Sequence, residues 1–130
     1  MSAIVYDASA LLAVIFDEPG AERTLSWLAR PGGEVSAVNW SEVATKLVER
    51  GLKPARVTTE LGAFGLDVIP LDETLAIAAA ALRPATRGLG LSLGDRCCLA
   101  LGQLRKARII TADTAWLQLP GFEIVSVREP

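Results

Sequence analysis

Four acidic residues have the types and positions needed for metal chemistry. Asp7 ends the apolar run 3–6, Glu42 and Asp95 lie near two expected helix starts, and Asp113 follows the apolar run 108–111. Four carboxylates brought together would raise one another's pKa, and such a cluster persists most easily when a cation neutralises it. The sequence therefore predicts a divalent metal site built from Asp7, Glu42, Asp95 and Asp113.

Oxygen ligands alone select a hard cation, so Mg²⁺ is expected, with Mn²⁺ as the alternative. A water that the metal acidifies can attack phosphorus, and a second ion could stabilise the leaving oxygen. The helix starts expected at Asn39 and Ser92 would add backbone N–H groups that favour phosphate. One or two ions and hydrolysis of phosphodiester bonds are the expected chemistry.

The sequence contains no histidine. This excludes a Ser-His-Asp triad, a histidine-bound zinc ion and a ribonuclease that works through paired histidines. Acid–base chemistry must then use carboxylates, amines, thiols or metal-bound water.

Three of the acids also have a purely structural explanation. Glu42 could complete a capping box with Asn39, Asp95 could do so with Ser92, and Asp113 could cap a short helix. An acid that ends an apolar strand has no such role, so Asp7 is the acid that the fold alone explains least.

Short apolar runs alternate with helical patterns along the chain. The expected strands are 3–6, 34–38, 67–70, 108–111 and 123–127, and the expected helices are 9–16, 21–30, 39–51, 54–64, 72–82 and 92–104. This alternation is typical of a parallel sheet covered by helices on both faces. Sites in such sheets form at the carboxyl ends of the strands. Asp95 reaches that edge only if the loop 87–91 delivers it there.

Composition is consistent with a folded protein of balanced charge. The 130 residues are 51% apolar and carry a net charge of −2, which argues against binding nucleic acid by bulk charge. Basic residues outnumber acids between positions 83 and 108, which indicates either a local phosphate-binding strip or a solvated helix face. Arg87 and Arg96 of this segment are the candidate RNA contacts, and Arg96 could instead pair with a nearby acid.

The two cysteines, Cys97 and Cys98, are adjacent inside an apolar helical pattern. They are expected to be reduced core residues. The first apolar stretch, 3–16, lacks a basic leader, contains Asp7 and is too short to span a membrane. A cytoplasmic protein without a membrane segment is expected.

Four segments, in order and spanning nearly the whole chain, resemble the PIN-domain family, specifically the VapC-type ribonuclease toxins of bacterial toxin–antitoxin pairs. The segments are 5–12, 39–43, 92–96 and 111–113. The resemblance implies one PIN-like domain over residues 1–130. Its expected fold is an α/β three-layer sandwich, with a five-stranded parallel sheet of order 3-2-1-4-5 flanked by helices.

The resemblance also implies roles for individual residues. Asp7 and Asp95 are the expected direct Mg²⁺ ligands, and Glu42 and Asp113 would bind through water, complete a second ion site or position the nucleophile. Supporting polar groups are expected at three further positions, Ser9, Asn39 and Thr111.

The implied partners are an RNA substrate, a second copy of the chain and a VapB-like antitoxin. The antitoxin's carboxy-terminal segment would pack on an apolar groove and can push a basic side chain toward the acids. Candidate contacts, which are also typical of an ordinary core, are Leu11, Leu12, Trp40, Leu47 and Phe64.

The leading hypothesis is therefore a Mg²⁺-dependent endoribonuclease that acts as a toxin. A related metal nuclease acting on DNA remains an alternative, because attack by metal-bound water needs no 2′-hydroxyl. A non-catalytic PIN-like binding module is a second alternative, although all four acids are present. A phosphoacceptor domain would require paired acids near the first strand, and only Asp7 stands there.

Overall fold

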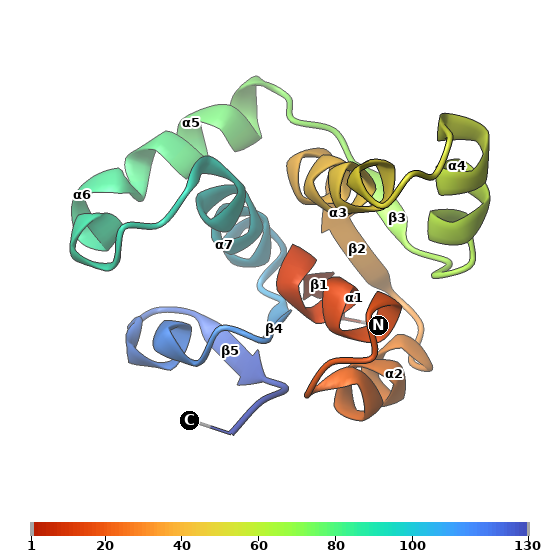
Figure 1. The fold of residues 1–130 in the computed structure, drawn as a ribbon. Helices are drawn as coiled ribbons and strands as arrows, with labels where there is room; N and C mark the ends of the chain where they lie inside the picture. The colour runs from red at the N-terminus through yellow and green to blue at the C-terminus, as the bar shows by residue number, and fades with distance from the viewer. Residues whose placement is uncertain (1, 130) are drawn as a thin grey trace.

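The computed structural model describes residues 2–129, which form a five-stranded parallel sheet between helices (Figure 1). The strands are β1 (Ile4–Tyr6), β2 (Gly33–Ser36), β3 (Asp67–Ile69), β4 (Arg108–Thr111) and β5 (Glu123–Ser126). Their order is β3-β2-β1-β4-β5 and every neighbouring pair is parallel, which confirms the expected fold class and strand order.

Helices fill the connections between the strands. They are α1 (Ala8–Ile15), α2 (Ala21–Leu28), α3 (Ala37–Glu49), α4 (Pro54–Gly62), α5 (Glu73–Ala81), α6 (Arg83–Thr86) and α7 (Leu93–Arg105), with short 3₁₀ turns η1 (Arg87–Leu89) and η2 (Thr114–Gln118). In Figure 1, α5, α6 and α7 gather on one side and α3 and α4 on the other. No helix within residues 2–129 is long and apolar enough to cross a membrane.

The central strand β1 is buried on both faces, as its uninterrupted apolar sequence predicts. Ile4 and Tyr6 pack with α1, α3 and α4, whereas Val5 packs on the opposite face with α5 and α7. Both cysteines are buried in this second core and are free thiols. The two cores fix the sheet between its helices, so the strand ends are held in place.

The start of α3 differs from the prediction. The second strand ends at Ser36 instead of residue 38, and the helix begins at Ala37 with Ser36 as its N-cap. The prediction that Asn39 caps this helix is wrong, because Ser36 Oγ already accepts a bond from the Asn39 backbone N–H at 3.1 Å. Asn39 is thereby freed for another role, and its side chain is fully buried.

Two other predicted helix starts are confirmed. Ser92 caps α7 and forms a reciprocal capping box with Asp95. Asp113 caps η2 by accepting the Ala115 N–H at 3.0 Å. Helix starts at such serines and aspartates satisfy backbone N–H groups that have no partner within the helix.

Candidate metal centre at the carboxyl edge of the sheet

Asp7 lies directly after β1 and is the most buried of the four acids, with 4% of its surface exposed. Two hydroxyls hold its Oδ2 atom: Ser9 Oγ donates at 2.6 Å and Thr111 Oγ1 donates at 3.0 Å. The Thr111 side chain comes from the end of β4, the strand next to β1. The structure therefore brings the predicted supporting residues Ser9 and Thr111 to Asp7.

The surroundings of Asp7 disfavour its charged form. The pKa of this carboxyl group is raised to about 6. Burial is the largest cause and the charges of Asp95 and Glu42 add to it, while the two hydroxyl bonds lower the pKa. A buried carboxylate with like charges close by is the electrostatic setting that a cation relieves.

Glu42 is held by Asn39. One turn into α3, Asn39 Nδ2 donates to Glu42 Oε1 at 3.0 Å and to the backbone carbonyl of Gly94 at 3.1 Å. Burial raises the pKa of Glu42, and the charge of Asp95 raises it further, although the bond from Asn39 lowers it. Asn39 thus links α3 to the first turn of α7 and orients the carboxylate between them.

Asp95 is positioned by its own helix. Its Oδ2 accepts the Ser92 backbone N–H at 3.0 Å, and its backbone N–H donates to Ser92 Oγ at 3.2 Å. Because α7 leads into β4, its first turn lies at the carboxyl edge of the sheet, so the loop before it does deliver Asp95 to Asp7. The capping role and proximity to the other acids coexist in this residue.

A glycine lets Glu42 approach α7. A Cβ atom added at Gly94 would lie 2.6 Å from Cδ of Glu42, closer than real side chains come. Any other residue at position 94 would displace this carboxylate. The glycine beside Asp95 thus leaves room for the Glu42 carboxylate in its present position.

Each of these three acids has one oxygen anchored by the protein, and its second oxygen accepts no hydrogen bond from the described residues. The anchored atoms are Oδ2 of Asp7, Oε1 of Glu42 and Oδ2 of Asp95. Across residues 2–129, no three acidic or thiol side chains converge closely enough to hold one ion directly. Mg²⁺ keeps several waters and binds proteins through one or two carboxylates. The donor set fits a partly hydrated Mg²⁺ ion, with the remaining acids acting through water.

Asp113 stands apart from this group. Its side chain is exposed, it caps η2, and its charge is not among those that raise the pKa of Asp7. Its backbone N–H donates to Thr111 Oγ1 at 3.0 Å, which steadies the hydroxyl that bonds Asp7. The structure supports a capping role for Asp113, and its role at a metal remains a prediction.

The basic residues of the segment 83–108 differ in their contacts. Arg105 pairs with Glu34 at 2.9 Å, and the Arg96 guanidinium donates to the Ala79 carbonyl of α5 at 3.2 Å. No acid among the described residues pairs with Arg96. Arg87 is exposed in η1. Contact of Arg87 or Arg96 with RNA stays a prediction, and the guanidinium of Arg96 is already engaged with α5.

Sequence reasoning missed two residues that build the site. Ser36 both caps α3 and donates to Oδ1 of Asn39 at 2.5 Å, and its place three residues before Asn39 was the available signal. Gly94 was the second, and a glycine inside the first turn of a helix is unfavourable enough to suggest a close approach. Cys98 also lies near the acids: burial raises its thiol pKa well above the usual range, and the charge of Asp7 raises it further.

Comparison with known proteins agrees with this architecture. Residues 4–122 match the PIN domain family. Because the match covers most of the chain, the protein belongs to the PIN-domain family, as the resemblance implied. No curated protein sequence matches the chain.

Solved structures share the fold at low sequence identity. A chain of a toxin–antitoxin complex from Klebsiella pneumoniae aligns with a TM-score of 0.77 and 21% identity, covering 98% of this chain and 100% of that one. A chain of DNA-bound VapBC from Salmonella typhimurium aligns with a TM-score of 0.76 and 20% identity over 98% and 99%. A chain of VapBC2 from Rickettsia felis, bound to a promoter DNA fragment, aligns with a TM-score of 0.73 and 15% identity, covering 95% of this chain and 98% of that one.

Proposed function

We propose that this protein is a Mg²⁺-dependent endoribonuclease of the VapC type, the toxin of a toxin–antitoxin pair. The observation that carries the proposal is the carboxylate of Asp7, whose pKa is raised first by burial and then by the charges of Asp95 and Glu42. Burying this carboxylate beside two other acids is electrostatically unfavourable. It lies at the carboxyl edge of the sheet, where the sites of α/β proteins form. Its likeness to chains of toxin–antitoxin complexes supports the biological role.

The proposed role of each acidic side chain follows from the hydrogen bonds that hold it. Asp7, fixed by Ser9 and Thr111, provides a rigid ligand oxygen, and Asp95 provides a second one from the first turn of α7. When bound, Mg²⁺ acidifies a water and neutralises charge on the phosphate. Oε2 of Glu42 orients the attacking water and takes its proton, a task that a raised pKa favours.

The substrate assignment rests on the family resemblance, because attack by a metal-bound water needs no 2′-hydroxyl. The direct test offers the purified protein end-labelled RNA and DNA of the same sequence, each with Mg²⁺ and with EDTA. We expect internal cleavage of RNA with Mg²⁺ only. Cleavage of DNA but not RNA would overturn the substrate, and cleavage in EDTA would overturn the metal mechanism.

An apolar groove supports an antitoxin partner. It has a volume of about 360 Å³ and is lined by Val14, Ile15, Leu25, Leu47, Leu52, Glu60, Ala63 and Phe64. Of the predicted contacts, Leu47 and Phe64 line this groove, whereas Leu11 is fully buried core. We assign the groove to the carboxy-terminal segment of a VapB-like protein, since exposed apolar grooves of this kind suit an amphipathic peptide.

Charge placed in the groove tests this assignment. Leu25 is 51% exposed, so Leu25→Glu should leave the fold intact and weaken binding of the antitoxin encoded by an adjacent small reading frame. Leu104→Glu, at a site 49% exposed on α7, is the matched control and should bind normally. Equal co-purification of the antitoxin with both variants would place the partner elsewhere.

A further inference from the structure

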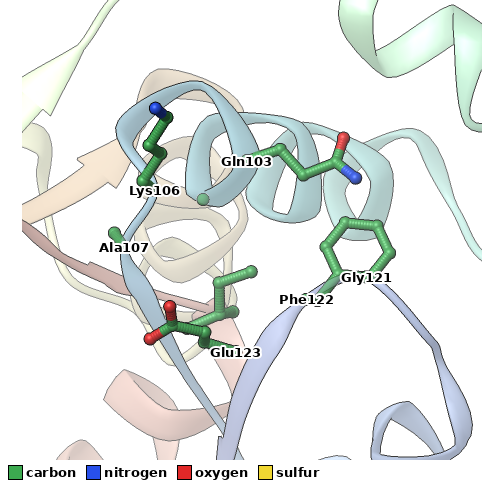
Figure 2. Close-up of a pocket in the computed structure, with 8 residues that line it drawn as sticks. Gln103, Lys106, Ala107, Gly121, Phe122 and Glu123 are labelled. Atoms are coloured by element: carbon green, nitrogen blue, oxygen red, sulfur yellow. The ribbon is translucent and has the colours of Figure 1, made fainter.

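Two adjoining hollows lie at the amino ends of the strands, at the opposite edge of the sheet from the acids. One has a volume of about 380 Å³ and is bounded by the starts of β1, β4 and β5 and by the residues before β2. The other, of about 280 Å³, lies between the end of α7 and the start of β5 (Figure 2). Both are lined by Lys106 and Glu123. Together they fall within the size range of ligand sites, roughly 300–1,000 Å³.

The larger hollow carries unpaired positive charge. Arg30, Lys106 and Arg108 line it, opposed by the single carboxylate of Glu123. Within residues 2–129, no carboxylate oxygen lies within 4.0 Å of these three cations, although Arg105 nearby pairs with Glu34 at 2.9 Å. Three cations gathered around one hollow attract an anion, and two arginines suit a phosphate group.

Trp27 holds the two arginines in place. The guanidinium carbon of Arg30 lies 4.0 Å from the centre of the Trp27 ring, and that of Arg108 lies 5.5 Å from it. Trp27 itself is packed against the core of that face of the sheet. Cation–π contacts of this kind restrict long side chains before a ligand arrives, so less entropy is lost on binding.

The smaller hollow offers different chemistry. Figure 2 shows the amide of Gln103, on α7, next to the ring of Phe122, with Glu123 set apart from them toward Ala107. A partly exposed aromatic ring can stack on a nucleobase, and a glutamine amide can both donate to and accept from a base edge. Gly121 adds no side chain to this wall, so the hollow stays open.

We propose that the two hollows form one binding site for a nucleotide, distinct from the acidic centre. The phosphate binds Arg30, Lys106 and Arg108 in the larger hollow, and the base stacks on Phe122 beside Gln103 in the smaller one. Glu123, which borders both hollows, accepts hydrogen bonds from the ribose hydroxyls. A free nucleotide and the phosphorylated end of an RNA strand present this same chemistry.

Calorimetric titrations in EDTA test the site without any dependence on nuclease activity. The probes are inorganic phosphate, AMP and a five-residue RNA with a 5′-phosphate. We expect AMP to bind more tightly than phosphate, and Lys106→Gln and Arg108→Gln each to weaken AMP binding by roughly tenfold. Lys106→Gln leaves the Trp27 contacts intact, and Lys53→Gln, an equal charge change on an exposed residue elsewhere, should bind as the unaltered protein does.

Two further variants separate the hollows. Phe122→Leu keeps an apolar side chain but loses the stacking ring, so it should weaken AMP binding and leave phosphate binding unchanged. Glu123→Gln removes the opposing charge and should tighten binding of phosphate.

Competition between AMP and the RNA identifies the source of the nucleotide. If the RNA binds the site more tightly than AMP does, the site is assigned to the phosphorylated end of an RNA strand. If the RNA binds more weakly than AMP, the site is assigned to a free nucleotide. Absence of AMP binding at millimolar concentration would overturn the proposal. So would unchanged affinity in Lys106→Gln and Arg108→Gln, or AMP binding no tighter than phosphate. The titrations stand apart from the nuclease proposal, because they contain no metal and involve none of the four acids.

Discussion

At Asp7, burial and charge act against each other. The carboxyl group is almost fully buried, two hydroxyls favour its charged form, and the charges of Glu42 and Asp95 disfavour it. The outcome is a pKa of about 6 in place of 3.8. The sequence already singled out this residue, because an acid that closes an apolar strand has no capping role. The family resemblance had already implied supporting polar groups at Ser9 and Thr111, and the pairing of β1 with β4 brings Thr111 to Asp7.

This shift predicts a specific pH dependence of stability for the metal-free protein. Between pH 4 and 6 the unfolded chain has lost the Asp7 proton while the folded chain retains it, so the free energy of unfolding falls as pH rises. The contribution of Asp7 is about 3 kcal/mol across this window. Urea unfolding in EDTA of the unaltered protein and of Asp7→Asn should show it. Parallel pH profiles of the two proteins would contradict the account.

Asp95 combines two roles that substitution can separate. Asp95→Asn removes the charge but keeps an oxygen that can accept the Ser92 N–H, so stability should hold while RNA cleavage is lost. Ser92→Ala removes the cap oxygen but keeps the charge, so the free energy of unfolding should fall by about 1 kcal/mol with cleavage largely retained. Thermal melts and cleavage rates report the two effects. Loss of both properties in both variants would show that the roles are inseparable.

At the scale of elements, the site depends on how closely α3 and α7 approach. Asn39 joins the two helices by donating to Glu42 and to the Gly94 carbonyl. The sequence located both helices but misplaced the start of α3, because Ser36 and Asn39 are both good capping residues. Only the pairing of β2 with its neighbours decides where the strand ends, and this pairing is a long-range property that local propensity does not contain.

Gly94→Ala tests this close approach. The added methyl group would collide with the Glu42 carboxylate, which lies at the end of a flexible side chain and can turn away, so the variant should lose much of its cleavage activity while its free energy of unfolding changes little. Gly62→Ala in α4 is the matched control: nothing lies within 4 Å of the added atom, and stability should rise by about 0.5–1 kcal/mol. Equal behaviour of the two variants would remove the steric argument.

At the scale of the whole molecule, the alternation of short apolar runs and helical patterns was enough to predict a parallel sheet with helices on both faces. The strand order came from the family resemblance, and the structure confirms it. Within the basic segment 83–108, Arg105 is engaged by Glu34 and Arg96 by α5, and the sequence contained no signal for either contact. Spacing along a chain does not determine which side chains share a surface.

A homodimer remains a proposal, and exposed apolar side chains on adjoining helices support it. Ile77 of α5 is 65% exposed and Leu93 at the start of α7 is 50% exposed. Burying both against a second copy removes apolar surface from water. Ile77→Glu should therefore lower the mass measured by light scattering toward that of one chain, with Leu104→Glu as the control. A monomeric unaltered protein would contradict this expectation.

The central claim, that Asp7 and Asp95 hold the catalytic Mg²⁺, is tested most directly by single-turnover RNA cleavage measured against Mg²⁺ concentration. The rate should saturate with Mg²⁺ in the unaltered protein and in Asp67→Asn, an exposed control on β3. In Asp7→Asn and Asp95→Asn the cleavage rate should fall further. Loss of a residue that only supports a metal ligand costs roughly 10–100-fold, and the loss of a direct ligand should exceed this. Cleavage by both variants at the unaltered rate and the same Mg²⁺ midpoint would contradict the account.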